Sequence, residues 1–137
     1  MIQMPLDIYA EEIISNYEHP HNKGKIDSPS VKLHENNPVC GDDITIYCAI
    51  KGDRLEDVKF EGDGCAISMG TASMLTDFVK GKSLSEIERM DLNTIKELIG
   101  MDPGPARVKC ATLALKTLKG SLFLYQHKEP DASTKEL

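Results

Sequence analysis

A chain of 137 residues is long enough to bury the core of one domain. Its formal net charge of −6 and its pI near 5.2 argue against a nucleic-acid-binding protein, which usually presents a basic face. No apolar stretch is long enough to cross a bilayer, and the first residues lack the basic and apolar segments of a secretory signal. We therefore expect one cytoplasmic domain over residues 1–137, with neither a membrane nor a nucleic acid as its partner.

The first half of the chain predicts a helix followed by a small antiparallel sheet. Apolar residues recur at helical spacing in the first segment and at every second position in the paired strands. The expected segments are a helix over 5–17, a short strand over 31–33, a loop over 35–42 and a hairpin of strands over 43–50 and 54–60. The glycines of residues 61–64 are expected to end the last strand.

The second half of the chain predicts helices. The expected helices cover 66–80, a short segment from 83, a segment from 91 and about 106–124. Gly81 ends the first of them, Ser83 and Glu86 form a capping-box pattern, and Asp91 has the position of a helix cap. The polar tail over 127–137 is expected to be frayed. With its core over about 6–124, the chain is expected to form a single α+β domain.

Four cysteines are present, and a cytoplasmic protein keeps such residues reduced. They are therefore packing residues, catalysts or metal ligands. Cys48 shares one strand face with Ile44, Ile46 and Ile50, which predicts that it packs in the core.

Cys40, Cys65 and Cys110 have a different setting. The first two lie in loops rich in glycine and aspartate, and the third lies in the first turns of the last helix. Loops held by a rigid scaffold often carry function. Cys65 also directly precedes a helix, whose N-terminus favours a thiolate. A thiolate is the form of cysteine that binds a metal or attacks sulfur.

Asp42 lies two residues after Cys40, and Gly41 between them permits a tight turn that can aim both side chains at one point. Together with Cys65 and Cys110 they would form a set of three sulfur ligands and one oxygen ligand. Such a set suits Zn²⁺, or an iron–sulfur cluster with one weak ligand. Spacing alone leaves a second interpretation open, namely three unconnected cysteines, because the chain has no Cys-x-x-Cys pair.

Four segments have a more specific pattern. They are residues 17–24 (Tyr-Glu-His-Pro-His-Asn-Lys-Gly), 36–42 (Asn-Asn-Pro-Val-Cys-Gly-Asp), 60–68 (Phe-Glu-Gly-Asp-Gly-Cys-Ala-Ile-Ser) and 105–113 (Pro-Ala-Arg-Val-Lys-Cys-Ala-Thr-Leu). In this order they resemble the signature motifs of the IscU/SufU/NifU-N-terminal family of iron–sulfur cluster assembly proteins. The similarity extends from about Ile8 to Leu118.

The resemblance implies a three-stranded antiparallel sheet covered by helices, with a metal site at one exposed end. It implies that Cys40, Asp42, Cys65 and Cys110 bind iron and hold a [2Fe–2S] cluster. In the family, sulfur arrives as a persulfide from a cysteine desulfurase, and the finished cluster passes to apo-proteins. The resemblance points to Cys110 as the first sulfur acceptor in IscU-like members and to Cys40 in SufU-like members.

The sequence departs from both branches of the family. Lys109 stands where IscU-type members have a histidine, as in SufU-type members, and its ammonium group has no lone pair with which to bind a metal. The extra segment that SufU-type members carry ahead of the third cysteine is absent. Residues 103–107 (Pro-Gly-Pro-Ala-Arg) replace the chaperone-binding motif of IscU, which argues against recognition by a dedicated Hsp70.

Three functions follow from these features. The first is a scaffold that builds and transfers a cluster, which is a carrier more than an enzyme. The alternative is a SufU-like, zinc-dependent sulfurtransferase that uses the same four ligands. The third is a structural zinc domain, against which Asp42 argues because structural zinc sites prefer closed sets of Cys and His. Among the histidines, His19 and His21 are assigned structural roles in a turn, and a structural role is also preferred for His34.

Overall fold

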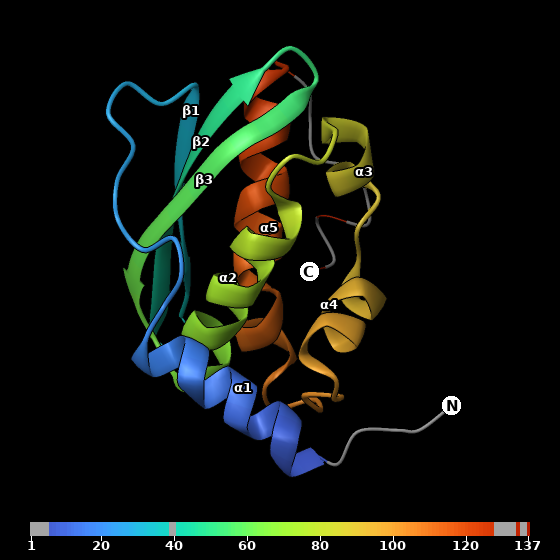
Figure 1. The fold of residues 1–137 in the computed structure, drawn as a ribbon. Coiled ribbons are helices and arrows are strands. Elements are labelled where there is room, and N and C mark those ends of the chain that lie inside the picture. Colours follow the sequence, from blue (N-terminus) through green and yellow to red (C-terminus); the bar gives the residue numbers. More distant parts are fainter. Residues whose placement is uncertain (1–5, 39–40, 128–133, 135–136) are drawn as a thin grey trace.

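The computed structural model describes residues 6–38, 41–127, 134 and 137, and for residues 6–10 it describes the backbone alone. The helices and strands of this region are shown in Figure 1. They are α1 (Leu6–Glu18), β1 (Val31–Asn37), β2 (Asp42–Lys51), β3 (Arg54–Asp63), α2 (Ala66–Val79), α3 (Leu84–Glu88), α4 (Leu92–Ile99) and α5 (Val108–Tyr125). No helix within the described residues has both the length and the apolar character needed to cross a membrane.

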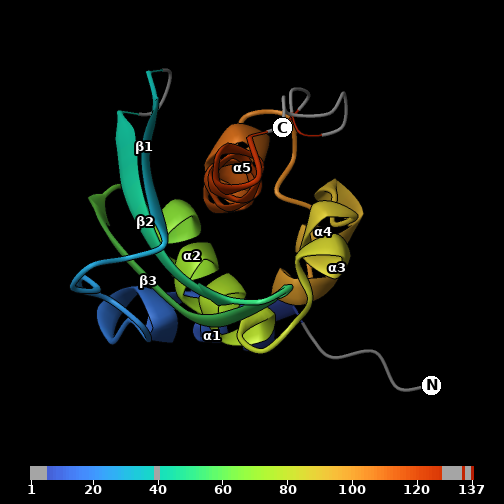
Figure 2. The ribbon, with the colours of Figure 1, turned by 90° about the horizontal axis from the view of Figure 1, so that it is seen from above.

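The three strands form one antiparallel sheet in the order β1-β2-β3. The sheet curves around α2 and α5, which cover its inner face, and α1 crosses one end of α2 (Figure 1). Figure 2 shows α5 at the centre of the molecule, with β1 and β2 on one side of it and α3 and α4 on the other. The predicted α+β fold with a three-stranded antiparallel sheet is confirmed.

The inner face of β2 forms the centre of the core. Ile44, Ile46 and Cys48 are at most 1% exposed, whereas Thr45 between them faces the opposite side and is half-buried. This alternation follows from the two-residue period of a strand. The prediction that Cys48 packs in the core is confirmed.

The pairing of β2 with β3 contains one irregularity. Ile50 pairs with Leu55, but the preceding Ala49 pairs with Asp57, so β3 has one extra residue at this point. Leu55 and Val58 are therefore both fully buried although they lie three positions apart. The extra residue explains why Leu55 does not follow the alternation of the rest of β3.

Two strands are longer than expected. β1 continues to Asn37 instead of ending at residue 33, and β3 continues to Asp63 through Gly62, which lies in the segment that was expected to end it. Gly62 has a φ of +152°, and a Cβ there would lie 2.1 Å from the carbonyl oxygen of Asp43. Glycine at this position therefore permits β2 and β3 to approach each other, and it does not act as a turn residue.

Two helix starts were predicted correctly from their caps. Ser83 Oγ accepts a hydrogen bond from the backbone N–H of Glu86 at 3.2 Å, and Asp91 Oδ1 accepts one from the backbone N–H of Thr94 at 3.2 Å. Each contact satisfies an N–H group that has no acceptor within its helix.

The helices α1 and α2 approach each other closely through a glycine. A Cβ at Gly70 would lie 2.6 Å from the carbonyl oxygen of Ile13, which is closer than a side-chain carbon can come. Ile13 is itself 2% exposed. The absence of a side chain at Gly70 therefore lets α1 approach α2 closely.

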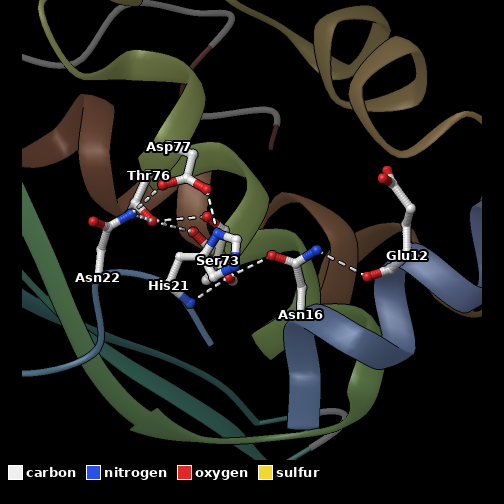
Figure 3. A network of polar contacts seen from close by, with 8 residues as sticks. Glu12, Asn16, His21, Asn22, Ser73, Thr76 and Asp77 are labelled. Carbon is white, nitrogen blue, oxygen red and sulfur yellow. Dashed lines mark hydrogen bonds and ion pairs between the residues drawn. The ribbon is translucent and has the colours of Figure 1, made fainter. Parts of the chain in front are cut away.

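Polar contacts tie the turn after α1 to α2 (Figure 3). The backbone N–H of His21 donates to Ser73 Oγ at 2.8 Å, and the His21 ring contacts the Asp77 carboxylate. Asn22 Nδ2 donates to Asp77 Oδ1 at 2.8 Å, and Ser73 Oγ donates to Asn16 Oδ1 at 2.6 Å. These contacts support the structural role that was expected for His21.

The C-terminal tail is not frayed throughout. Thr134 is 2% exposed and Leu137 is 7% exposed, and the Leu137 side chain packs against the hydrophobic core. The carbonyl oxygen of Leu137 accepts a hydrogen bond from Lys109 Nζ at 2.9 Å. The prediction of a frayed tail is therefore wrong for these two residues, and the other residues after His127 lie outside the described part of the chain.

The environment of Cys48 leads to a stability prediction. Burial raises the pKa of this thiol to about 11, and its Sγ lies 3.5 Å from Ser121 Oγ. Cys48→Ser should lower the free energy of unfolding by about 1–2 kcal/mol, because a hydroxyl is more costly to bury than a thiol and Ser121 offsets only part of that difference. Urea unfolding of wild type, Cys48→Ser and Cys48→Ala measures the change. Metal content should not change, and loss of metal from a folded Cys48→Ser variant would contradict the packing role.

Candidate metal centre

The end of β1 and the start of β2 form one wall of the site. Asn37, the last residue of β1, pairs directly with Asp42, the first residue of β2, so both flank the four-residue connection that contains Cys40. Gly41 has a φ of +71°, which is the left-handed conformation that its position in a tight turn requires. Asp42 is 1% exposed. Cys40 itself lies outside the described residues.

The second wall is the start of α2. Cys65 is the N-cap residue of this helix, and its Sγ accepts a hydrogen bond from the backbone N–H of Ser68 at 3.5 Å. The backbone N–H of Cys65 in turn donates to Asp42 Oδ1 at 3.1 Å. One carboxylate oxygen of Asp42 is thereby tied to the N-terminus of α2.

The third wall is the first turn of α5, in which Cys110 is fully buried. Asn37 Nδ2 donates a long hydrogen bond to Cys110 Sγ at 4.0 Å. Lys109, the residue before Cys110, donates a hydrogen bond from its ammonium group to the carbonyl oxygen of Leu137. Three elements that are distant in the sequence therefore meet at one end of the sheet.

The potential ligand atoms of Asp42, Cys65 and Cys110 all lie within 4.8 Å of one another. Asp42 Oδ2 is buried and has no hydrogen-bond partner among the described residues. A buried carboxylate oxygen without a partner is unfavourable, and a cation at this point would stabilise it. Two thiols and this oxygen therefore fit a metal ion that accepts sulfur and oxygen ligands, such as zinc or iron.

The electrostatics of the site favour a thiolate at Cys65. Burial raises the pKa of this thiol and the Asp42 carboxylate raises it further, but hydrogen bonds from Ser68 and Ile67 outweigh both and hold the pKa below its ordinary value. Cys48 shows the opposite behaviour, because burial dominates there and keeps the thiol protonated. Of these two cysteines, only Cys65 has the environment of a metal ligand.

Sequence reasoning missed two residues of the site. A Cβ at Gly64 would lie 2.4 Å from Ser68 Oγ and 2.7 Å from Asp42 Oδ1, so the absence of a side chain lets Asp42 reach Cys65. Asn37 was counted as part of a loop and proves to be a buried strand residue beside Cys110. The register of β1 against β2 is the signal that identifies Asn37, and that register is visible only in the folded sheet.

One histidine can be placed relative to the site. His34 is exposed, and its Nε2 lies 3.5 Å from Asp43 Oδ1 on the outer face of the sheet. Asp43 and Asp42 are consecutive strand residues and therefore face opposite sides. The structural interpretation preferred for His34 agrees with this position.

Comparison with known proteins gives the same assignment as the fold and the site. Residues 8–132 match the model of the NifU-like N terminal domain. The chain is 41% identical over 129 residues to the zinc-dependent sulfurtransferase SufU of Bacillus subtilis. This alignment covers 82% of this chain and 87% of that protein. It is 34% identical over 121 residues to the iron–sulfur cluster assembly scaffold protein IscU 1 of Archaeoglobus fulgidus, with 88% of this chain and 78% of that protein covered.

A solved structure is similar as well. The crystal structure of FiSufU from Fervidobacterium islandicum, a candidate iron–sulfur cluster assembly scaffold protein for the SUF system, superposes with a TM-score of 0.70 at 32% identity. The superposition covers 84% of this chain and 97% of that one. The three-stranded sheet, the convergence of Asp42, Cys65 and Cys110, and these similarities together show that the chain belongs to the NifU-like N-terminal domain family of iron–sulfur cluster assembly proteins.

Proposed function

We propose that this protein is a scaffold for iron–sulfur cluster assembly. In this proposal Cys40, Asp42, Cys65 and Cys110 bind iron, a [2Fe–2S] cluster forms at these ligands, and the cluster passes to apo-proteins. Two observations carry the proposal: Asp42 Oδ2 is buried without a partner among the described residues, and a carboxylate oxygen of Asp42 lies within 4.8 Å of the sulfurs of Cys65 and Cys110. Family membership supports it independently.

The ligand set suits a cargo that must leave. Thiolates bind iron firmly, whereas a carboxylate is a hard oxygen ligand and forms the weakest bond to a cluster iron. Asp42 is also held by the backbone N–H of Cys65, so it can release the metal without losing its position. One weak ligand in a fixed position lets the cluster exchange while the protein stays folded.

Sulfur is supplied by a cysteine desulfurase in this proposal. The acceptor thiolate attacks the outer sulfur of the desulfurase persulfide, a new S–S bond forms on the acceptor, and the desulfurase cysteine leaves as a thiolate. Cys110 is 0% exposed and can accept sulfur only after a local opening. This burial argues against Cys110 as the first acceptor. We propose the cytoplasm as the compartment of this chemistry, because a reducing compartment keeps such thiols available.

A zinc-dependent sulfurtransferase is the alternative function. The observation that favours it is Lys109, which stands where IscU-type proteins have a metal-binding histidine and directs its ammonium group to Leu137. Similarity to the SufU of Bacillus subtilis also favours it. In this case Zn²⁺ would occupy the same ligands, and one thiolate would leave the metal to accept sulfur.

Metal analysis followed by anaerobic reconstitution distinguishes the two functions. The purified protein is assayed for zinc and iron, then incubated with ferrous iron, cysteine, a cysteine desulfurase and a thiol reductant that converts the transferred persulfide sulfur to sulfide. Visible absorption from thiolate-to-iron charge transfer supports the scaffold. Tightly bound zinc, no cluster and stimulated desulfurase turnover support the sulfurtransferase.

A first prediction concerns the weak ligand. Asp42→Ala should retain its cluster longer and transfer it about tenfold more slowly, because the labile oxygen ligand is gone. The measurement is anaerobic transfer to an apo-ferredoxin, with the rate normalised to loaded protein. Asp43→Ala is the matched control, since Asp43 faces the opposite side of the sheet and should transfer like wild type. Faster transfer by Asp42→Ala would contradict the role of Asp42.

A second prediction concerns Gly64, which contacts the site without being a ligand. Gly64→Ala should weaken zinc binding at least tenfold, because its Cβ would displace Ser68 or Asp42. Competition with a chelator measures the affinity. Gly120→Ala serves as the control, because a Cβ there would meet only the end of the Leu33 side chain at 3.0 Å. Equal affinity in both variants would show that the position of Asp42 is unimportant for the metal.

A further inference from the structure

Asn37 is a buried polar residue beside the cysteine site, and no role has yet been given to its side chain. It is 6% exposed at the end of β1, and its Nδ2 lies 4.0 Å from Cys110 Sγ. Asn36 before it has the same side chain but is exposed. Two consecutive asparagines of one strand therefore have opposite environments.

The register of the sheet explains this difference. Asn37 pairs with Asp42, whereas Asn36 pairs with Asp43, and residues that are paired in an antiparallel sheet point to the same face. The Asn37 amide thus lies on the inner face together with the Asp42 carboxylate. The two ends of the β1–β2 connection place one hydrogen-bond donor and one anionic oxygen beside Cys110.

A neutral amide is a suitable neighbour for a sulfur ligand. The N–H group donates to sulfur, and such a bond strengthens when the sulfur carries a negative charge. It withdraws charge from the thiolate without competing for the metal, because an N–H group has no lone pair to donate. A partner of this kind orients a ligand and adjusts the strength of its bond to the metal.

We propose that Asn37 is a positioning residue for Cys110. Its side-chain amide holds the sulfur of Cys110 toward the Asp42 carboxylate and Cys65 Sγ, and it withdraws charge from this sulfur when a metal is bound. The inference rests on the proposed function only in assuming that Cys110 binds a metal. It assigns to the motif of residues 36–42 a residue that acts on the motif of residues 105–113, across 73 positions of sequence.

The test compares Asn37→Leu with Asn36→Leu. Leucine has nearly the shape of asparagine but donates no hydrogen bond, and the two variants change the same residue type in the same strand. Affinity for Zn²⁺ alone is measured by competition with a chelator. The protein is also loaded with Co²⁺ alone, and the energy of its thiolate-to-cobalt charge-transfer band is recorded. Asn37→Gln restores an amide N–H donor at this position without adding a metal ligand.

Asn37→Leu should bind Zn²⁺ about tenfold more weakly than wild type. Its charge-transfer band should move to lower energy, because a sulfur that loses a hydrogen bond gives up electrons more easily. Asn36→Leu should resemble wild type in both measurements, and Asn37→Gln should recover at least part of the band shift. A merely structural role for Asn37 would change stability but leave the band energy of the folded, loaded protein in place.

Two results would overturn the inference, and they differ from each other. If wild type binds Zn²⁺ and Co²⁺ but Asn37→Leu matches Asn36→Leu in affinity and band energy, the positioning role is wrong and the metal site stands. If wild type binds neither metal nor a cluster, the proposed function itself fails, and the inference fails with it. Should Asn37→Leu not fold, Asn37→Ala carries the same two expectations and is compared with Asn36→Ala.

Discussion

The site depends on the hydrogen bond between Asp42 Oδ1 and the backbone N–H of Cys65. This contact joins the start of β2 to the start of α2, two segments that the whole β2–β3 hairpin separates in the sequence. It satisfies one of the N–H groups at the start of the helix, and it leaves the second oxygen of this carboxylate, which lies beside the sulfurs of Cys65 and Cys110, without a partner among the described residues. The same interaction therefore supports the fold and prepares the site for a cation.

The absence of side chains at two glycines makes this contact possible. Gly62 lets β2 and β3 approach each other next to Asp43, and Gly64 leaves the space that the Asp42 carboxylate occupies. Glycine-rich segments are usually interpreted as turns. Here Gly62 permits close packing of the β2 and β3 backbones, and Gly64 makes room for the Asp42 carboxylate. Because Gly62 stays within the sheet, β3 extends further than its sequence indicated.

The cysteines illustrate how environment separates residues of one type. Cys48 lies in the apolar core, and burial raises the pKa of its thiol to about 11. Cys65 caps a helix, and hydrogen bonds from Ser68 and Ile67 lower the pKa of its thiol despite partial burial. The first environment suits packing and the second suits ligation. The hydrogen bonds of the helix N-terminus, more than exposure itself, account for the difference.

The sequence by itself determined the α+β class, the core role of Cys48, the caps at Ser83 and Asp91, and the family, because periodicity, capping patterns and motifs are local features. It could not bring the cysteines together, since their spacing was also compatible with three unconnected residues. Only the tertiary structure decided that Asp42, Cys65 and Cys110 meet, and that Asn37 joins them while Asn36 does not. The physical reason is that strand register and helix placement set these distances, and both depend on pairing and packing between segments far apart in the chain.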